Sequence, residues 1–416
     1  MSACQFRVRM GNDVMKRLLF VDDDVNLLMG LRRGLHSKRT EWEMEFVDSG
    51  NAALAAMTTK PFDVVVSDMR MPGMDGSELL NRVQERFPQT IRILLSGQSD
   101  RESILKSIAP SHQYLSKPCD IHQLAALLTQ TIALTDLLEN PAVKSFTSRL
   151  SSLPSLPSLY LEMTTALRAA DPSPARIAGI IAQDMGMTAK ILQLANSARS
   201  GIRGEVTQAQ QAVMLLGLDT VQALVLSLGV FSSFGQRIMG HCAMEALWQD
   251  SSLTSLYSRA IARAEGVELS AMGSFLSAGL LHDIGKLIIA SSDPELYRTI
   301  LETVRATGKA VWEVEQELLG CTHAEIGAYL LGIWGLPVQI VEAVAWHNRP
   351  SLSPVRTFSP LVAVHVATAM CAKKACASQG SEQALDMVFV ERLGLTDRLQ
   401  TWIAACEEVG EQRQAV

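Results

Sequence analysis

Residues 17–22 read Arg-Leu-Leu-Phe-Val-Asp, a short apolar run that ends in an acid. A run of this length without polar alternation is typical of a buried parallel β-strand. Two later segments repeat the pattern: residues 62–68 read Phe-Asp-Val-Val-Val-Ser-Asp, and residues 91–96 read Ile-Arg-Ile-Leu-Leu-Ser. Segments with helical periodicity lie between these runs. The alternation of strand and helix over about 120 residues predicts a parallel, doubly wound α/β domain.

The whole chain has 416 residues, of which 48% are hydrophobic and 19% are charged. This length exceeds that of one typical domain of about 100–200 residues, so two or three domains are expected. The character of the sequence changes near residue 150, where Pro and Ser punctuate the chain. Later segments have helical periodicity and are separated by Gly and Pro. We therefore expect an all-helical second half after the α/β domain.

The composition also indicates which partners the protein lacks and in which cellular compartment it is found. The formal net charge is -6, so the chain lacks the basic excess that holds a nucleic-acid backbone. The seven cysteines are scattered without a Cys-x-x-Cys pair, which argues against a disulfide framework and a zinc ribbon. No segment approaches the roughly 18 uninterrupted apolar residues of a membrane span. We expect a soluble, cytoplasmic protein without a nucleic-acid or membrane partner.

Polar residues follow the predicted strands where each strand ends. Asp22 and Asp23 follow the first run, and Asp68 ends the second. Because ligands bind outside the carboxyl ends of parallel strands, these three carboxylates should converge there, and their repulsion needs a cation. Carboxylate oxygens are hard ligands that suit Mg²⁺. Lys117 and Ser96 end two further runs and add an ammonium group and a hydroxyl to the predicted site.

These residues resemble the receiver domain of two-component response regulators. The resemblance covers roughly residues 16–138 and rests on four motifs in order, Phe-Val-Asp-Asp-Asp, Ser-Asp-Met-Arg-Met-Pro-Gly-Met-Asp-Gly, Leu-Leu-Ser-Gly and Tyr-Leu-Ser-Lys-Pro. It implies a five-stranded, flavodoxin-like sheet in a phosphoprotein of phosphorelay signal transduction. Asp68 would carry the aspartyl phosphate, and Lys117 would pair with the phosphoryl group. The phosphoryl donor would be a sensor histidine kinase or a phosphotransfer protein.

The same resemblance implies roles for the remaining residues of the site. Asp22 and Asp23 would hold Mg²⁺ together with the phosphoacceptor and the carbonyl oxygen of Arg70. Ser96 and Tyr114 would form the switch that responds to phosphorylation. The family often has Thr at the position of Ser96, and the serine keeps the hydroxyl.

The second half of the chain resembles the HDOD domain, a non-catalytic relative of the HD phosphohydrolases. The residues that carry this resemblance are Leu-Pro-Ser-Leu-Pro at 153–157, the segment 180–198 and the segment 211–218. The pattern of these segments predicts the apolar faces of core helices and indicates no catalytic or ligand-binding residues. The resemblance implies an output domain that binds another signalling protein or a second copy of this chain.

One motif of the second half does suggest chemistry. Gly-Leu-Leu-His-Asp-Ile-Gly-Lys contains the doublet His282-Asp283, and such a doublet binds metal in HD phosphohydrolases. His323 and His347 resemble the additional histidines of binuclear relatives. Asp250 stands where that family has an upstream histidine, and Thr368 stands where it has the closing aspartate. The candidate vestigial metal site consists of Asp250, His282, Asp283, His323 and His347, and a second metal is not expected.

Several functions remain open at this stage. The leading hypothesis is a phosphorylation-gated interaction protein. The rival is a receiver-controlled, metal-dependent phosphohydrolase or phosphodiesterase of the HD superfamily. The alternative for the His282-Asp283 doublet is a purely structural role, as a buried pair that caps adjacent helices. A DNA-binding regulator is least favoured, because the output half shows no helix-turn-helix signature.

The expected organisation has five parts: a flexible leader (1–15), the receiver domain (16–138), a linker helix or junction (139–152), the HDOD-like domain (153–350) and a helical extension (351–416).

Two further expectations concern the ends of the receiver domain. Receiver-like strands commonly begin a few residues after the initiator, so Met15 is a second candidate for the start of translation. The last receiver helix continues its apolar positions into the junction, which makes a homodimer plausible.

Overall fold

We describe the protein from a computed structural model of the chain. The chain divides into two compact units, of which the first comprises Met1–Glu139 with Gln193–Gly204 and Ile333–Gly335 and the second comprises the rest. The second is called the helical unit below. The structure describes residues 15–97, 111–117, 120–137, 140–148, 153–155, 157–167, 171–197, 205–218, 221, 231–233, 241–375 and 384–414. The predicted leader therefore lies outside the described residues, except for Met15.

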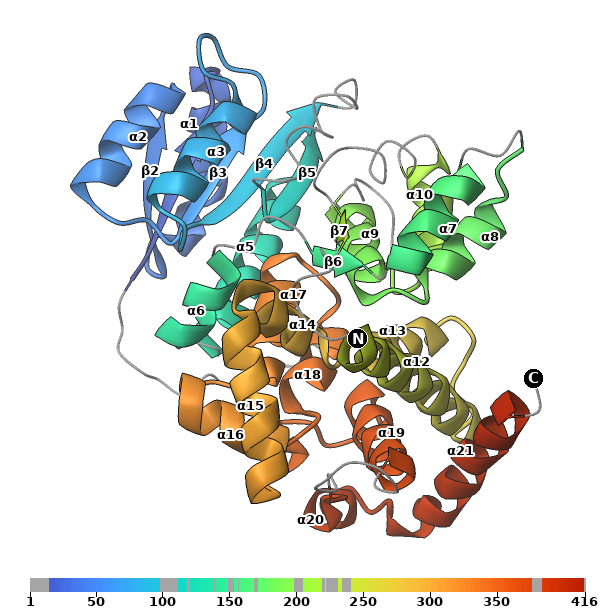
Figure 1. The fold of residues 1–416 in the computed structure, drawn as a ribbon. Coiled ribbons are helices and arrows are strands. Elements are labelled where there is room, and N and C mark those ends of the chain that lie inside the picture. Colours follow the sequence, from blue (N-terminus) through green and yellow to red (C-terminus); the bar gives the residue numbers. More distant parts are fainter. Residues whose placement is uncertain are drawn as a thin grey trace. The chain divides into compact units, whose positions relative to one another are not determined.

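A parallel sheet forms the centre of the first unit (Figure 1). Its strands, in the order in which they lie side by side, are β2 (Trp42–Val47), β1 (Lys16–Val21), β3 (Val64–Asp68), β4 (Ile91–Gly97) and β5 (Gln113–Lys117). All four pairings are parallel. The helical elements of this unit are α1 (Val25–Gly34), η1 (His36–Lys38), α2 (Gly50–Thr59), α3 (Gly76–Arg86) and α5 (Ile121–Leu137). The predicted parallel sheet with helices is confirmed.

Burial explains why the strand-forming runs of this sheet are continuously apolar. All residues of β3 are buried, as are the last four of β1, because both faces of the central strands are covered. Residues of α2 and α3, including Leu54 and Leu79, pack into one core with Leu19, Val65 and Leu94. The parallel register places the carboxyl ends of β1 and β3 side by side. The first candidate site lies at these ends.

The second half of the chain is built mainly from helices. Helix α12 packs against α13, α19 and α21, and α18 packs against α13 and α19. The C-terminal helices therefore belong to the same packed unit as α12 and α13. The helical elements are α6 (Pro141–Ser148), α7 (Pro157–Leu167), α8 (Pro174–Ile181), α9 (Met185–Ser197), α10 (Ala209–Leu216), α12 (His241–Ala264), α13 (Met272–Leu281), α14 (Ile284–Ser292), α15 (Pro294–Thr307), α16 (Val311–Leu319), α17 (His323–Ile333), α18 (Val338–Trp346), η2 (Pro350–Leu352), α19 (Pro360–Ala375), α20 (Met387–Arg392), η3 (Thr396–Arg398) and α21 (Leu399–Gln414).

The prediction of an all-helical second half is wrong in one detail. Strands β6 (Leu153–Ser155) and β7 (Phe231–Ser233) form a small parallel pair in the helical unit. Each strand has three residues, which is too short for a polar–apolar alternation to be recognised in the sequence. The pair joins segments that are far apart along the chain.

One stretch of the helical unit is unusually apolar. Met272–Ser292 is long and apolar enough to cross a membrane, yet 89% of its most apolar window is buried inside the protein. The stretch comprises α13 and α14, which meet at the His282-Asp283 doublet. Its apolar character is that of a core helix pair that carries site residues.

Glycines let the backbones of the helical unit approach closely. A Cβ atom on Gly285 would overlap the backbone carbonyl oxygen of His323, so α14 and α17 touch without an intervening side chain. A Cβ on Gly279 would lie 2.6 Å from the Cα of Ser255, which makes α13 and α12 similarly close. These contacts fix the positions of the helices that carry the histidines.

We expect Gly285→Ala to destabilise the protein by at least about 1–3 kcal/mol, because the added methyl group must displace the backbone of α17. Gly179→Ala is the matched control: Gly179 lies within α8, and a Cβ atom added there would have no neighbour within 4 Å. The same change at this position should stabilise the protein by about 0.4–1 kcal/mol. Urea unfolding followed by circular dichroism measures both. Equal effects of the two substitutions would contradict the close contact.

Candidate functional site

The first candidate site gathers three carboxylates at the ends of β1 and β3. Asp22 and Asp23 directly follow β1, and Asp68 is the last residue of β3. One oxygen of each lies within 4.8 Å of the others. Asp22 and Asp68 are buried, whereas Asp23 is exposed. The arrangement offers hard oxygen ligands to a cation that stays accessible to solvent, and the residues fit Mg²⁺.

Lys117 forms ion pairs with both buried carboxylates of this site. It is the last residue of β5, and its Nζ lies 2.8 Å from Asp22 Oδ2 and also pairs with Asp68 Oδ1. The second oxygen of each acid is held by backbone: the Asp24 N–H donates to Asp22 Oδ1 at 2.9 Å, and the Arg70 N–H donates to Asp68 Oδ2 at 2.9 Å. Both buried acids are therefore fixed in orientation.

The charges of the site shift the pKa values of its members. Burial raises the pKa of Asp68, and the nearby Asp22 carboxylate adds to this rise against the opposing effect of Lys117. Burial opposes the charge of Lys117, but its hydrogen bonds to Asp22 and Asp68 raise its pKa overall. The ammonium group is therefore firmly charged, and an added cation would ease the crowding of the carboxylates.

The predicted switch residues lie on the two neighbouring strands β4 and β5. Ser96 pairs with Ser116 in the strand register, and Tyr114 pairs with Leu94. The side chains of Ser96 and Tyr114 lie outside the described residues. Their strands end at the same edge as β3, which is consistent with the place that the sequence assigns to them.

The second candidate site is a buried cluster of histidines in the helical unit. His282 follows α13, His323 begins α17, and His347 follows α18. All three surround Asp283, which precedes α14: His323 Nε2 lies 3.2 Å and His347 Nε2 lies 3.7 Å from Asp283 Oδ1, and His282 Nε2 lies 3.3 Å from Oδ2. All four side chains are at most 7% exposed. Four helices thus bring these side chains to one point.

Hydrogen bonds orient each imidazole through its Nδ1 atom. His282 Nδ1 donates to the Gly279 carbonyl and His347 Nδ1 to the Val344 carbonyl, each at 2.8 Å. His323 Nδ1 donates to Glu315 Oε2 at 2.6 Å. These bonds turn the three Nε2 atoms toward the Asp283 carboxylate.

Glu315 and Lys286 complete the cluster, although the sequence did not single out either as part of it. Glu315 lies on α16, which ends at Gly320 in the left-handed conformation, and the following turn brings His323 back against it. Lys286 Nζ lies 2.7 Å from Asp283 Oδ2, one helical turn along α14. Glu315 has no motif around it, so only the tertiary turn reveals its role.

The cluster strongly perturbs the pKa values of its members. Despite the opposing effect of burial, the charges of His282 and Lys286 hold the pKa of Asp283 well below its ordinary value. Burial, with repulsion from the two other histidines, holds the pKa of His347 well below its usual value. Asp283 is therefore a carboxylate and His347 a neutral imidazole at neutral pH.

Two further residues considered from the sequence stand apart from this cluster. Asp250 is exposed on α12 and lies outside the group of close ligand atoms found among the described residues. Partial burial and the charge of Asp283 raise its pKa. Thr368 donates its hydroxyl to the His365 carbonyl of its own helix at 2.9 Å. The structure thus brings together His282, Asp283, His323 and His347.

The capping interpretation of the doublet is also wrong for one member. Asp283 occupies the N-cap position of α14, but its side chain makes no capping hydrogen bond there. The carboxylate instead faces the histidines and Lys286. His282 does bond to a carbonyl of the helix that it follows.

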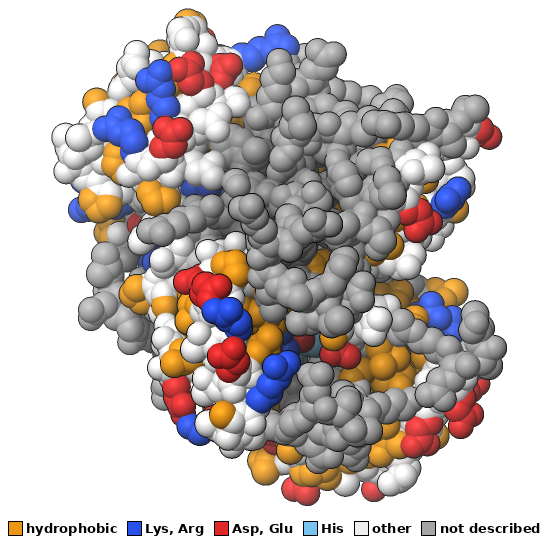
Figure 2. Space-filling view, viewed as in Figure 1, with side chains coloured by type: hydrophobic (Ala, Val, Ile, Leu, Met, Phe, Trp, Pro, Cys, Tyr) orange, Lys and Arg blue, Asp and Glu red, His pale blue; other side chains and the backbone are white. Residues whose placement is uncertain are grey.

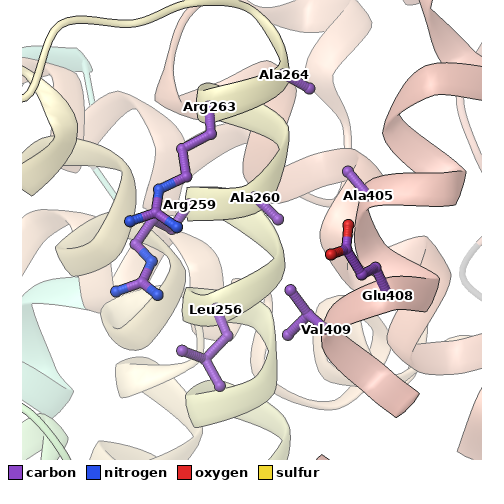
Figure 3. A pocket seen from close by; sticks show the side chains of 8 residues that line it. All are labelled: Leu256, Arg259, Ala260, Arg263, Ala264, Ala405, Glu408 and Val409. Carbon is purple, nitrogen blue, oxygen red and sulfur yellow. The ribbon is translucent and has the colours of Figure 1, made fainter. Parts of the chain in front are cut away.

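A surface groove of about 580 Å³ lies between α12 and α21 of the helical unit. In Figure 3, Arg259 and Arg263 project from one side of α12, while Glu408 and Val409 face α12 from α21. The groove is partly open, and small, apolar and charged side chains line it. It offers a contact surface and lies on different helices from the histidine cluster, which α13, α14, α17 and α18 carry.

Comparison with known proteins assigns both parts of the chain. Residues 18–129 match the model of the response regulator receiver domain, and residues 153–350 match that of the HDOD domain. The chain is a response regulator with an HDOD domain. The two matches cover the strands that carry the carboxylates and the helices that carry the histidine cluster.

Individual relatives of this response regulator match only part of their own length. An uncharacterized protein of Treponema pallidum is 26% identical over 253 residues, which is 58% of this chain and 48% of that protein. The DNA-binding transcriptional regulator NtrC of Klebsiella pneumoniae is 37% identical over 114 residues, 27% of this chain and 24% of that one. The chain thus spans less than half the length of these relatives.

Two solved structures, of a response regulator and of a receiver domain, match parts of the chain. The MmoQ response regulator of Methylococcus capsulatus is 26% identical, with a TM-score of 0.45, and the match covers 61% of this chain and 98% of that chain. The receiver domain of an HD domain-containing protein from Pseudomonas fluorescens is 33% identical, with a TM-score of 0.27, over 28% of this chain and 94% of that one.

We expect Asp23→Asn to weaken Mg²⁺ binding by the receiver at least about tenfold, because one of three carboxylates is lost while the buried pair keeps its hydrogen bonds. Isothermal titration calorimetry measures the affinity. The control is Glu41→Gln, which removes an exposed charge at the start of β2, where it pairs with Lys38. If Asp23→Asn binds Mg²⁺ as tightly as this control, Asp23 is not a ligand.

Proposed function

We propose that this response regulator accepts a phosphoryl group on Asp68 and that the change gates its HDOD domain. The observation that supports this most is the convergence of Asp22, Asp23 and Asp68 with Lys117 at one edge of the sheet. The donor is a sensor histidine kinase or a phosphotransfer protein, as receiver domains in general require. The protein is cytoplasmic in this proposal, with no nucleic-acid or membrane partner.

The proposed chemistry uses each residue of the pocket. Asp22 and Asp23 hold Mg²⁺ with Asp68 and the carbonyl of Arg70, and the ion screens the negative charge of both reactants. One carboxylate oxygen of Asp68 attacks the phosphorus atom, and the donor group leaves. The other oxygen keeps its hydrogen bond to the Arg70 N–H.

Phosphorylation would then rearrange the ion pairs of the pocket. The phosphoryl group brings about -1.5 to -2 units of charge, which draws the Lys117 ammonium group from its present pairing with the two acids. The Ser96 hydroxyl and the Tyr114 ring respond as the switch in this proposal. The local change in charge thereby becomes a change in the surface that β4 and β5 present.

The output half acts by binding rather than by catalysis in this proposal. The receiver domain spans residues 16–138, the junction 139–152, the HDOD domain 153–350 and the helical extension 351–416. The target is another signalling protein or a second copy of the chain. The groove between α12 and α21 supports a protein partner, because it is partly open to solvent and Arg259, Arg263 and Glu408 line it with charges of both signs.

The surface charge agrees with a protein partner. On the face drawn in Figure 2, acidic and basic side chains are interspersed over the described surface. Opposite-charge pairs occur among the described residues, such as Arg82 with Glu78 and Lys60 with Glu43. A surface of mixed sign lacks the basic field that attracts a nucleic-acid backbone.

The rival phosphohydrolase function has one observation in its favour, the convergence of three histidines on Asp283. A hydrolytic centre, however, must admit a phosphate ester and keep a coordination position open for water. The cluster is buried, and Lys286 already pairs with one oxygen of Asp283. A binding role for the output domain therefore agrees better with the described geometry.

Treatment of the full chain with acetyl phosphate and Mg²⁺ should label the wild type and not Asp68→Asn. Intact-mass measurement detects the added phosphoryl group, and hydroxylamine should release it because acyl phosphates react with that nucleophile. Asp63→Asn is the control, since Asp63 lies at the amino end of β3 and bonds to the Arg17 N–H. Labelling of Asp68→Asn at the wild-type level would refute the assignment.

Gating predicts that the phosphorylated chain recovers a protein partner, or a second copy of itself, that the untreated chain does not. Affinity capture with both forms, together with sedimentation of the purified chain, measures this difference. Asp68→Asn treated with the same phosphodonor serves as the control, because it has the same exposure to the reagent. Equal recovery and equal mass in all three samples would count against gating.

A further inference from the structure

The groove between α12 and α21 has one of its walls in the helical extension. The HDOD match includes α12 and ends at residue 350, whereas α21 lies beyond it. Glu265, directly after α12, holds the extension in place: its Oε1 accepts from Arg398 Nε at 2.7 Å and from Trp402 Nε1 at 2.8 Å. Trp402 is fully buried. The extension therefore adds this groove to the HDOD domain.

The two helices that form the groove run antiparallel. The end of α12 lies beside the start of α21, since Arg398 Nη2 donates to the carbonyl of Ala264 at 3.0 Å. Leu256, earlier on α12, and Val409, further along α21, line the same groove. The lining residues of α12 from Leu256 to Ala264 thus lie along those of α21 from Ala405 to Val409, so each level of one wall has a counterpart on the other.

The floor of the groove is apolar and only half-buried. Its side chains are Leu256, Ala260 and Ala264 on α12 and Ala405 and Val409 on α21. In Figure 3, Ala260 and Ala264 point toward α21. Small side chains between the helices leave room for groups from another surface. An apolar centre with a charged rim is the composition of protein–protein interfaces.

The charged rim of the groove is not neutralised within the chain. Arg259 and Arg263 lie one turn apart on α12, and Glu408 faces α12 from α21 (Figure 3). Within the part of the chain that the structure describes, neither guanidinium group forms an ion pair or a hydrogen bond. The opposite charges of the two walls therefore do not pair with each other. An occupant complements both walls when it brings an acid to the arginines and a donor to Glu408.

We propose that this groove is the contact surface between two copies of the chain. A second copy carries both of the required groups, because its Glu408 is an acid for the arginines and its arginines are donors for Glu408. This inference rests on the binding role proposed above for the output half, and it identifies the bound protein as the chain itself.

The charge pattern selects one arrangement of the two copies. Contacts between identical surfaces are related by a two-fold axis. An axis parallel to the groove places α12 of one copy opposite α21 of the other at the same level, so Arg259 and Arg263 face Glu408 of the second copy. An axis across the groove would instead set arginines against arginines. The first arrangement pairs the charges and buries the apolar floor of both copies.

Sedimentation equilibrium of the full chain measures self-association, both untreated and phosphorylated with acetyl phosphate and Mg²⁺. Arg259→Glu with Arg263→Glu should weaken association at least about tenfold, because the two-fold axis repeats each new repulsion. Arg298→Glu with Arg305→Glu is the matched control, since it makes the same change in net charge on exposed side chains of α15. This control should associate like the wild type. Circular dichroism verifies that each variant is folded.

A charge swap separates a second copy from any other protein partner. Glu408→Arg alone should also weaken association, whereas its addition to Arg259→Glu with Arg263→Glu should restore the wild-type affinity to within about threefold. Restoration is expected because each copy of the triple variant offers a basic α21 to the acidic α12 of the other. A different partner keeps its own charges, so the triple variant would not recover binding to it.

The inference is overturned if the wild-type chain is monomeric in both forms, or if Arg259→Glu with Arg263→Glu associates like the α15 control. It is also overturned if the folded triple variant associates as weakly as the double variant. These outcomes do not affect the labelling of Asp68, which is measured separately. Charge-dependent association that is equal in the untreated and phosphorylated chains supports the groove contact and contradicts gating.

Discussion

The contact between Gly285 and the backbone of His323 is the constraint on which the helical unit depends. Because any side chain at position 285 would overlap that carbonyl oxygen, α14 and α17 can meet only at a glycine. The contact sets His323 beside Asp283, two residues before Gly285. A similar close contact between a glycine and a backbone carbonyl occurs in the first unit, where a Cβ on Gly76 would overlap the carbonyl oxygen of Asp68, the proposed phosphoacceptor. In both units a missing side chain brings a helix against a site residue.

The two sites differ in their access to water, and this difference separates their proposed roles. In the receiver pocket Asp23 is exposed and the Lys117 side chain is 26% exposed, so a hydrated ion and a phosphodonor can enter and leave. In the histidine cluster the Asp283 side chain is 7% exposed and the histidines less. An accessible pocket of hard oxygen ligands suits an exchanging Mg²⁺, whereas the histidines and Asp283 are packed into the core of the helical unit.

The sequence predicts the sheet and its acidic edge better than it predicts the histidine cluster. Strands that are buried on both faces are recognisable as apolar runs, and their polar ends must meet because parallel strands share an edge. Edge strand β2 was missed because it lacks the continuous apolar run of the central strands, although the alternation of Glu43 and Glu45 with apolar residues is typical of a half-buried strand. Glu315 could not be recognised, because its bond to His323 depends on a turn through Gly320 rather than on a spacing within one helix.

A lysine neutralises a carboxylate in each site, but its attachment to the chain differs. Lys117 and its partners Asp22 and Asp68 come from three different strands, so no local geometry holds the ammonium group to either acid. A new phosphoryl group can therefore compete for it, and the proposed switch follows from that competition. Lys286 lies one helical turn from Asp283 on α14, and their ion pair is local. The ion pair of the cluster therefore needs no partner from another element.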